Sequence, residues 1–424
     1  MTKQNSTPDT DFSLEHVAPS HKKPFWSMLV VMLGFTFFSA SMWSGGTLGM
    51  GLTVRDFIVA VLAGNLILGV YTGLLAYIAG RTGLSTHLLT RYSFGEIGSY
   101  LPSFLLSITQ VGWFGVGVAM FALPVQRVTG DNIYMLIGAA GLLMTFTAWF
   151  GIRALTALSF IAVPSIALLG SASVARGVEA AGGLEGLFAL TPDNPMAMTT
   201  AIGICVASFI SGGTLTPDFT RFAKKPSISV STTVIAFFVG NSLMFLFGAV
   251  GAALYKQSDI SDVMLRQGMI IPAMLVLGMN IWTTNDNALY ASGLGFSNIT
   301  RLPKKYMVLF NGLVGTVSAM YLYNNFVGFL SLLNTMLPSI GGVIIADYFL
   351  LRKRSYATLD VHRFSKLRGT AVAAWISGVL AARLLPGITA VNSILCSMAV
   401  YLIAEWFWKG YLKLRCNKKV SRRQ

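Results

Sequence analysis

The chain has 424 residues, of which 54% are hydrophobic and only 11% are charged, and its formal net charge is +15. Soluble domains carry about 25% charged residues, so this composition, with a mean hydropathy of +0.66, excludes an ordinary soluble protein. The charge deficit is local, because residues 25–52 and 132–151 contain no charged side chain. Apolar runs of about 18 or more residues are typical of membrane-spanning helices.

Polar segments flank this apolar chain. Residues 1–24 carry both charge signs and lack the basic start and cleavage site of a secretory signal, which predicts a retained cytoplasmic tail. Residues 410–424 are predicted to be a basic cytoplasmic tail near anionic lipid. The apolar runs between them predict twelve spans, at about 25–50, 54–80, 99–127, 133–152, 154–176, 199–218, 228–254, 269–295, 305–322, 324–350, 369–386 and 388–409. Two polar stretches, 81–98 and 257–268, are expected to hold short interfacial helices.

The positions of the basic residues predict the orientation. With the N-terminus inside, 25 of the 31 Lys and Arg residues lie in cytoplasmic segments. Cytoplasmic loops of membrane proteins are enriched in these residues. The pattern therefore predicts an inner-membrane protein with both termini in the cytoplasm.

Span spacing indicates an internal repeat. A shift of 167 residues moves the spans of residues 25–176 close to those of residues 199–350, and the sequence SGGTL occurs at both 44–48 and 211–215. Such a pentad is easily produced by chance in a chain with 43 glycines, so the spacing carries the prediction. Because five helices is an odd number, the second copy would be inverted, as in many secondary transporters. Residues 369–409 would add two further helices.

The central segment of the first helix in each predicted repeat has an unusual composition for a membrane helix. Residues 34–41 and 208–214 mix Gly, hydroxyl and aromatic side chains at mid-membrane depth. Glycine lowers the cost of unwinding a helix, and hydroxyls can satisfy the freed backbone groups. The occurrence of both segments at matching places favours broken helices over simple packing of small residues.

The third span contains Trp113 between glycines, in residues 110–117. Room beside the indole would allow a planar ligand to stack on it. The alternative is a large core residue packed against glycine backbones, and this segment alone favours that alternative.

The eighth span holds the most polar mid-membrane run, residues 280–287. Asn280, Thr283 and Thr284 share one helical face and offer neutral oxygen ligands suited to a weakly bound monovalent cation. Asp286 is the run's only carboxylate. An acid inside the membrane is a functional candidate, here as a proton carrier, with a hydrogen-bonded structural residue as the alternative.

Asp218 and Arg221 end the sixth span on the predicted cytoplasmic side. They could form part of an inner gate, with each other or with a neighbouring loop, or a plain surface pair that contributes little. The sequence has no phosphate-binding loop, no metalloprotease HExxH motif and no Ser/His/Asp set. This argues against an ATP-driven pump and against an enzyme.

Four segments together resemble the nucleobase–cation symport family. They are residues 37–43, 110–117, 211–222 and 280–295, and the resemblance extends over essentially the whole chain. It implies an all-α fold of the LeuT-like type, with a five-plus-five inverted repeat and two extra helices. It also implies uptake of a planar heterocycle together with a cation.

The resemblance assigns roles to residues of this chain. The substrate contacts it implies are Trp113, Phe209, Phe38, Ser208, Ser211, Asn280 and Asn285. The sodium ligands it implies are the carbonyl groups of Gly34, Phe37 and Asn280 and the hydroxyl groups of Thr283 and Thr284. Hydantoin-transporting members have Trp in place of Phe209 and Gln in place of Gly117, which puts a hydantoin-like substrate in doubt.

These observations predict a monomeric sodium symporter that imports cytosine by alternating access. Cytosine is flat and uncharged, and its edge both donates and accepts hydrogen bonds, as amide side chains do. Sodium would be the coupling ion, and no organic cofactor or nucleic acid is expected. The alternatives are a proton-coupled transporter of another base or small neutral solute, a passive channel, and a membrane sensor.

Overall fold

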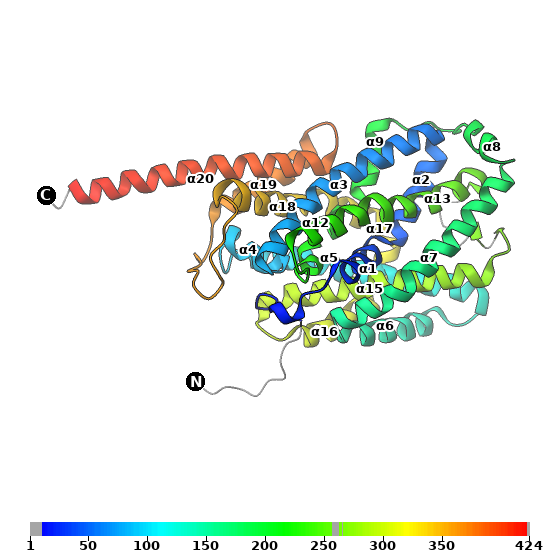
Figure 1. The fold of residues 1–424 in the computed structure, drawn as a ribbon, viewed down its shortest axis with the longest axis horizontal. Coiled ribbons are helices and arrows are strands. Elements are labelled where there is room, and N and C mark those ends of the chain that lie inside the picture. The colour runs from blue at the N-terminus through cyan, green and yellow to red at the C-terminus, as the bar shows by residue number, and fades with distance from the viewer. Residues whose placement is uncertain (1–10, 257–262, 265, 422–424) are drawn as a thin grey trace.

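The computed structural model describes residues 11–256, 263, 264 and 266–421, and within these ranges the regular elements are helices (Figure 1). The one extended contact there is an isolated bridge between Lys23 and Ala223. The predicted all-α class is therefore confirmed. The apolar segments form helices because a backbone inside a membrane must satisfy its own hydrogen bonds.

Each predicted span coincides with one helix or with consecutive helical pieces. The first half consists of η1 (Pro19–His21), α1 (Phe25–Thr36), α2 (Ser39–Gly51), α3 (Val54–Thr82), α4 (Thr86–Phe94), α5 (Tyr100–Thr129), α6 (Ile133–Trp149), α7 (Ile152–Ala180) and α8 (Leu184–Ala189). The second half begins with α9 (Met198–Ala207), α10 (Ile210–Thr214), α11 (Thr216–Thr220), α12 (Pro226–Ile235), the π-helix η2 (Ala236–Asn241) and α13 (Ser242–Tyr255). It continues with α15 (Ile270–Thr300), α16 (Lys304–Asn324), α17 (Phe326–Met336), α18 (Pro338–Ile345), the π-helix η3 (Ala346–Leu351), α19 (Gly369–Leu384) and α20 (Thr389–Ser421).

The outer surface fits a lipid environment. Six helices in the described ranges are each long and apolar enough to cross a membrane, and the bent pair α1–α2 makes a seventh. Large apolar side chains point outward from several helices, including Leu142, Leu168 and Val317, which is 80% exposed. Such faces are unstable in water and stable against hydrocarbon. The count of twelve crossings stays a prediction.

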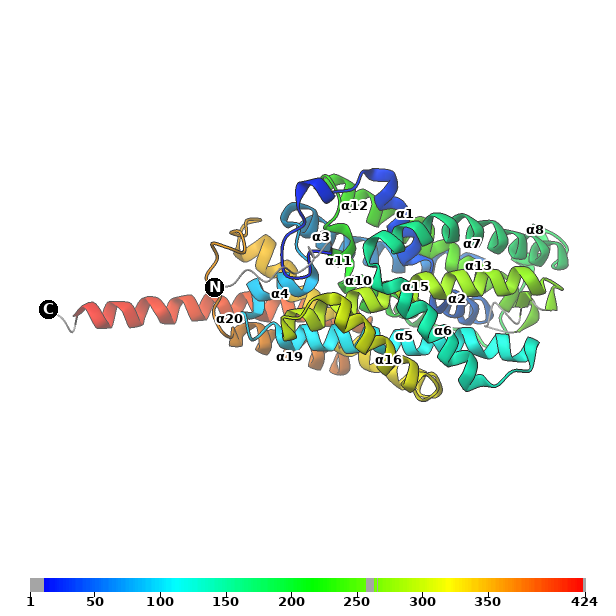
Figure 2. The ribbon, with the colours of Figure 1, turned by 90° about the horizontal axis from the view of Figure 1, so that it is seen from below.

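The last helix and the polar stretches can be compared with the predicted spans and interfacial helices. The last helix does not end near residue 409 but continues to Ser421, and it projects beyond the other helices in both views (Figures 1 and 2). Lys, Leu and Arg are good helix formers, and no proline interrupts this stretch. A short helix, α4, is present in the stretch 81–98 as expected, and all nine of its residues are buried, so its location at a membrane interface stays a prediction. Most of the stretch 257–268 lies outside the described residues.

The first predicted helix of each repeat is broken. The pieces α1 and α2 meet at an angle of 55° around Phe37 and Phe38. The sixth predicted span is divided at Ser208 and Phe209 into α9 and α10, and again at Leu215 before α11. This confirms the expectation that Gly- and Ser-rich segments interrupt these two helices.

The two broken helices run in opposite directions along their whole length. At one end, the Lys23 amide before α1 donates to the Phe222 carbonyl after α11. At the other end, the Met196 amide before α9 donates to the Gly51 carbonyl at the end of α2. This is the antiparallel relation that an inverted repeat predicts. The repeated pentad marks no equivalent position, because 44–48 lies inside α2 whereas 211–215 directly follows the break.

The helices around the breaks form two groups. The first, here called the scaffold group, consists of α5, α6, α15 and α16, which pack on one another. The second, the bundle group, contains α1, α2, α3, α9–α13 and η2. Within each group, glycines allow close backbone contact: a Cβ at Gly248 of α13 would overlap the Met42 carbonyl of α2, and one at Gly115 would lie 2.6 Å from the Gly315 carbonyl. The candidate site lies between the two groups.

Candidate substrate cavity

The helix breaks bring aromatic side chains together at the centre of the molecule. Phe38 is extended (φ −127°, ψ 128°) and Phe209 leaves the helical region (φ −132°, ψ −5°). The Phe209 ring contacts the ring of Phe35 edge-to-face at a centroid distance of 5.0 Å and that of Phe38 at 5.9 Å. Side chains from two separate repeats therefore meet only because both helices unwind here.

Trp113 of α5 faces these rings from the scaffold group. Its ring centroid lies 5.0 Å from that of Phe38, and its indole Nε1 donates to Ser211 Oγ at 3.4 Å. The neighbouring glycines serve helix packing, because a Cβ at Gly112 would lie 2.3 Å from the Phe329 ring. The side chain is 7% exposed, so the remaining accessible surface faces a small internal space.

That space is a cavity between the bundle and scaffold groups. It has a volume of about 40 Å³ accessible to the centre of a water molecule, which is room for roughly three waters. Its wall is formed by Phe35, Phe38, Gln110, Trp113, Ser208, Phe209, Ser211, Gly212, Thr284, Asn285, Asn287 and Ala288. Six of the seven predicted substrate contacts are thus brought together. An enclosure lined by four aromatic rings and several polar side chains is suited to a small planar ligand.

Two wall residues that the sequence analysis did not select carry unpaired donors. Gln110 Nε2 and Asn287 Nδ2 are buried and have no hydrogen-bond partner within the described part of the chain. Leaving such a group unpaired costs about 1–3 kcal/mol, which a ligand carrying acceptors would relieve. A signal for both existed: Gln110 is one turn before Trp113, and Asn287 is three residues after Thr284, on the same helical face.

The predicted contact Asn280 does not line the cavity. Its Nδ2 points to Met244 Sδ of α13, at 3.8 Å, and its Oδ1 has no partner among the described residues. The side chain is thus directed to the bundle group and away from the aromatic rings. Any role for Asn280 through its backbone carbonyl is unaffected by this geometry.

Asn285 does line the cavity, and the scaffold group fixes its amide. Its Nδ2 donates to the Phe114 carbonyl at 3.3 Å and contacts Met144 Sδ at 3.1 Å. The amide lies directly against Gly117, where a Cβ would be 2.1 Å from Asn285 Oδ1 and 2.9 Å from its Cγ. Because Gly117 has no side chain, the Asn285 amide can lie against the α5 backbone and does not extend into the cavity.

Substitution of Gly117 tests that positioning role. Gly117→Ala should push the Asn285 amide toward the cavity and raise the KM for substrate about tenfold or more, because overpacking costs roughly 1–3 kcal/mol. The matched control is Gly138→Ala in α6, where a Cβ would have nothing within 4 Å. Kinetics of substrate uptake measure both. An unchanged KM in Gly117→Ala would mean that the amide position does not matter.

The predicted cation ligands come from α1 and α15, which pack against each other. Thr283 Oγ1 donates to the Met279 and Asn280 carbonyls at 3.0 and 2.9 Å, and Thr284 Oγ1 donates to the Asn280 and Ile281 carbonyls at 3.0 and 3.1 Å. Because each hydroxyl proton is used within the helix, the outward side of each oxygen presents lone pairs. Such oxygens are suitable ligands for a monovalent cation.

Gly34 and Phe37 lie at the end of α1. Backbone carbonyl groups at a helix break can bind an ion, because they are no longer used in helical hydrogen bonds. The Phe37 amide still donates to the Leu33 carbonyl at 2.8 Å, so the helical hydrogen bonds stop just after it. A Cβ at Gly34 would lie 2.3 Å from Ser159 Oγ of α7. The close approach of α7 therefore covers α1 at Gly34.

Asp286 faces away from the cavity. Its Oδ1 accepts a hydrogen bond from Thr147 Oγ1 of α6 at 2.8 Å, and the Trp282 indole donates to the same hydroxyl at 2.9 Å. Its Oδ2 is buried without a hydrogen-bond partner in the described ranges. The acid thus links two scaffold helices, which is the structural alternative considered for it.

Asp218 and Arg221 do not pair through their side chains. The Asp218 carboxylate accepts from the Thr86 amide at 2.7 Å and lies 3.5 Å from His87 Nε2, both in α4. Arg221 Nε instead donates to the Asp218 backbone carbonyl at 3.2 Å. Both residues are fully buried, which corrects the surface-pair alternative. Among the described residues, the Asp218 side chain thus contacts the start of helix α4, and neither Arg221 nor a loop.

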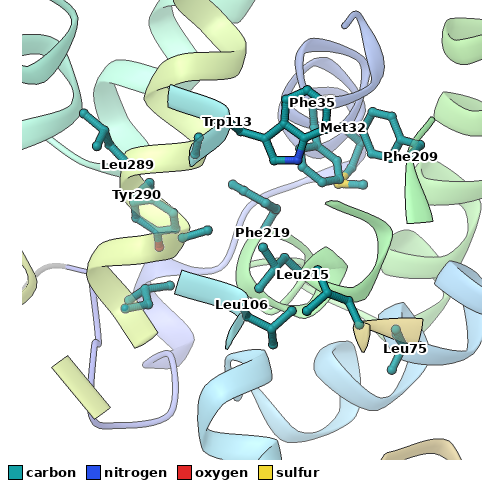
Figure 3. Close-up of a cluster of buried hydrophobic side chains, with 14 of the residues drawn as sticks. Met32, Phe35, Leu75, Leu106, Trp113, Phe209, Leu215, Phe219, Leu289 and Tyr290 are labelled. Carbon is teal, nitrogen blue, oxygen red and sulfur yellow. The ribbon is translucent and has the colours of Figure 1, made fainter. Parts of the chain in front are cut away.

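An apolar cluster separates the cavity from the end of the molecule where α11 ends. Figure 3 shows Phe219, Leu215 and Leu106 below Trp113, with Leu289 and Tyr290 to one side, and all five belong to one cluster of buried side chains. Their exposed fractions are 1% or less. This cluster, here called the apolar plug, leaves no room for a solute to pass in the present conformation.

The fold and the central cavity define a membrane transporter of the LeuT-like type. The structure of Mhp1, a nucleobase-cation-symport-1 family transporter, in a closed conformation with bromovinylhydantoin bound, matches with a TM-score of 0.83 and 21% identity, covering 93% of this chain and 95% of that one. A sodium-coupled sialic acid symporter matches with a TM-score of 0.70 and 14% identity, covering 94% and 93%. These likenesses confirm the predicted fold.

The chain belongs to the family of permeases for cytosine/purines, uracil, thiamine and allantoin, which matches residues 17–407. The cytosine permease of Escherichia coli K12 is 55% identical over 395 residues, covering 93% of this chain and 94% of that protein. The hydantoin permease of Microbacterium maritypicum is 22% identical, covering 96% and 89%. These relatives are permeases, in agreement with the predicted class of membrane transporter.

Proposed function

We propose that this permease imports cytosine together with sodium by alternating access. The observation that carries the proposal is the cavity between Trp113 and Phe209, with two unpaired amide donors in its wall. The 55% identity to a cytosine permease supports the choice of base. The bundle group would move against the scaffold group to open the cavity to each side in turn.

The wall chemistry complements the edge of cytosine. The base presents a carbonyl oxygen and a ring nitrogen as acceptors, which match the donors of Gln110 and Asn287. Its ring N–H and amino groups require acceptors, and the hydroxyl oxygens of Ser208 and Ser211 are available as such. The Ser208 hydroxyl donates to the Cys205 carbonyl at 2.9 Å, so its lone pairs remain for the ligand.

The wall also disfavours charged substrates. Its twelve residues include no acidic and no basic side chain, and an ion buried there would be left without a partner, which is costly. The apolar rings instead favour a neutral planar solute. Stacking of such a solute against an aromatic side chain contributes about 1–3 kcal/mol.

Sodium would couple to the base through α15. The same helix supplies Thr283 and Thr284 to the proposed ion site and Asn285 and Asn287 to the cavity wall. An ion joining α1 to α15 would fix both the break at Phe38 and the wall. Such coupling is reciprocal, so sodium and cytosine would each raise the affinity of the other.

The proposed setting is the bacterial inner membrane, with both termini in the cytoplasm and the protein acting as a monomer. The distribution of Lys and Arg supports this orientation. In this arrangement the apolar plug lies on the cytoplasmic side of the cavity. The present conformation would then be closed toward the cytoplasm.

Uptake of labelled cytosine into proteoliposomes tests the proposal. An inward sodium gradient should drive accumulation above the external concentration, and an equal gradient of potassium should not. Accumulation driven by a proton gradient without sodium would instead support the proton-coupled alternative. Equilibration without accumulation under every gradient would indicate a passive channel.

A further inference from the structure

The N-terminal segment 11–23 is a docked structure and not a free tail. It crosses the end of the molecule at which α11 ends and α15 and α16 meet. Ser13 and Val17 in this segment are 1% and 2% exposed. A polar segment ahead of the first membrane helix is buried to this degree only if the protein provides a binding surface for it.

Arg221 is the centre of that surface on the bundle side. Its Nη2 donates to the Asp11 carbonyl at 2.7 Å, and its Nη1 donates to the Phe12 carbonyl at 2.8 Å. The same guanidinium donates to the Tyr290 hydroxyl of α15 at 3.1 Å. Arg221 is fully buried, and hydrogen bonds from a buried charged group contribute more than neutral ones. The tail backbone therefore supplies two of the hydrogen-bond acceptors of this buried guanidinium group.

The Asp11 side chain contacts the other side of the interface. Its carboxylate lies 2.8 Å from Lys304 Nζ at the start of α16, and both groups are nearly buried. It also accepts from the Ile152 amide at the start of α7, at 3.2 Å. Gly151 makes room for it: a Cβ there would lie 2.3 Å from the carboxylate, and its φ of +67° is one that glycine adopts easily.

Further contacts hold the rest of the segment to the bundle group. Lys22 Nζ donates to the Arg221 carbonyl. Burial, and to a lesser degree the charge of Arg221, lower the pKa of Lys22 to about 8. The Lys23 carbonyl accepts from the Lys224 amide at 3.0 Å, and the Val17 amide donates to the Gly83 carbonyl after α3 at 3.0 Å.

One residue thus joins both groups of helices through different atoms. The backbone of Asp11 binds Arg221, which follows α11 of the bundle group, and its carboxylate binds Lys304, which begins α16 of the scaffold group. The apolar plug lies between these groups (Figure 3). Separation of the two groups at this end would break at least one of the two contacts.

We propose that segment 11–23 is an intramolecular latch that holds the plug side of the permease closed, with Asp11 as its fastening residue. The latch rests on the proposed alternating-access movement but not on the identity of the base or the ion. Release of Asp11 from Lys304 or from Arg221 would be required each time the cavity opens past the plug. Loss of the carboxylate charge should therefore shift the resting equilibrium toward the open form.

A buried cysteine reporter measures that equilibrium. Ser107 of α5 directly follows Leu106 of the plug in the sequence; it is fully buried, and its Oγ has no hydrogen-bond partner in the described part of the chain. Ser107→Cys would be introduced into a protein whose three cysteines, Cys205, Cys396 and Cys416, are replaced by serine. The rate at which a hydrophilic maleimide labels the purified protein then reports how often the plug side opens.

Asp11→Asn should accelerate labelling about tenfold or more, because it removes one charge of a nearly buried ion pair. Lys304→Gln should do the same, and the double variant should show little further increase. The matched control is Glu15→Gln, which removes an exposed acid of the same segment and should leave the rate unchanged. Thermal melting of each variant excludes labelling caused by unfolding.

Equal labelling rates in Asp11→Asn, Glu15→Gln and the parent protein would overturn the latch. Additive effects of Asp11→Asn and Lys304→Gln would also contradict it, since a shared contact can be lost only once. Because the readout needs neither cytosine nor sodium, a negative uptake experiment would leave this test intact. Conversely, normal sodium-driven uptake with unchanged labelling would reject the latch alone.

Discussion

Trp113→Ala is expected to reduce the uptake of cytosine about 100-fold at low substrate concentration, because loss of aromatic stacking on a base costs about 1–3 kcal/mol. The substitution also removes the donor to Ser211 Oγ and enlarges the cavity. Trp113→Phe should retain part of the activity, since it keeps an aromatic face but loses the N–H group. Initial rates of labelled cytosine uptake in proteoliposomes measure the effect.

The control for this experiment is Trp26→Ala, which removes an indole that is 72% exposed, far from the cavity. It should transport like the parent protein. Both variants should be compared at equal amounts of folded protein, judged by size-exclusion chromatography. Near-normal uptake by Trp113→Ala would show that the base does not bind between the aromatic rings.

Thr283→Ala is expected to raise the sodium concentration for half-maximal uptake about tenfold while cytosine affinity at saturating sodium changes little. Thr283 lies on the α15 face assigned to the ion but does not line the cavity, whereas Thr284 does both. Loss of one oxygen ligand should therefore act on the ion selectively in Thr283→Ala. Thr284→Ala should weaken sodium dependence as well, with some loss of base affinity.

Thr283→Ser is the matched control, because it keeps the hydroxyl and removes only a methyl group. Its sodium dependence should stay close to that of the parent protein. If Thr283→Ala and Thr284→Ala both retain normal sodium dependence, the cation site lies elsewhere. Coupling through Asp286 would then be examined by Asp286→Asn under a proton gradient.

The positions of the helices could be predicted because span length follows directly from apolar composition. Every predicted span coincides with helical structure, and the two interrupted helices were indicated by Gly- and Ser-rich segments at 34–41 and 208–214. A break is a local property of the backbone, so local sequence can reveal it. Trp113, Phe209 and Phe38 follow from the resemblance to the family, because they lie at or opposite those breaks.

The direction in which each polar side chain points could not be predicted in the same way. Helices that are apolar all round have no strong periodicity to show which face is inside. The resemblance implied Asn280 as a cavity contact, although its side chain points to Met244, while Gln110 and Asn287 were not selected. Two partners of Arg221 are the backbone carbonyls of residues about 210 positions away, and no local pattern contains that information.

The most direct test of the account is equilibrium binding of cytosine to the purified permease in sodium and in choline at equal ionic strength. Saturable binding is expected that is about tenfold or more tighter in sodium, a typical coupling strength, and that is lost in Trp113→Ala. Binding of equal affinity in both salts would contradict the shared role of α15 in holding base and ion. Binding of unchanged affinity in Trp113→Ala would show that cytosine does not bind in this cavity.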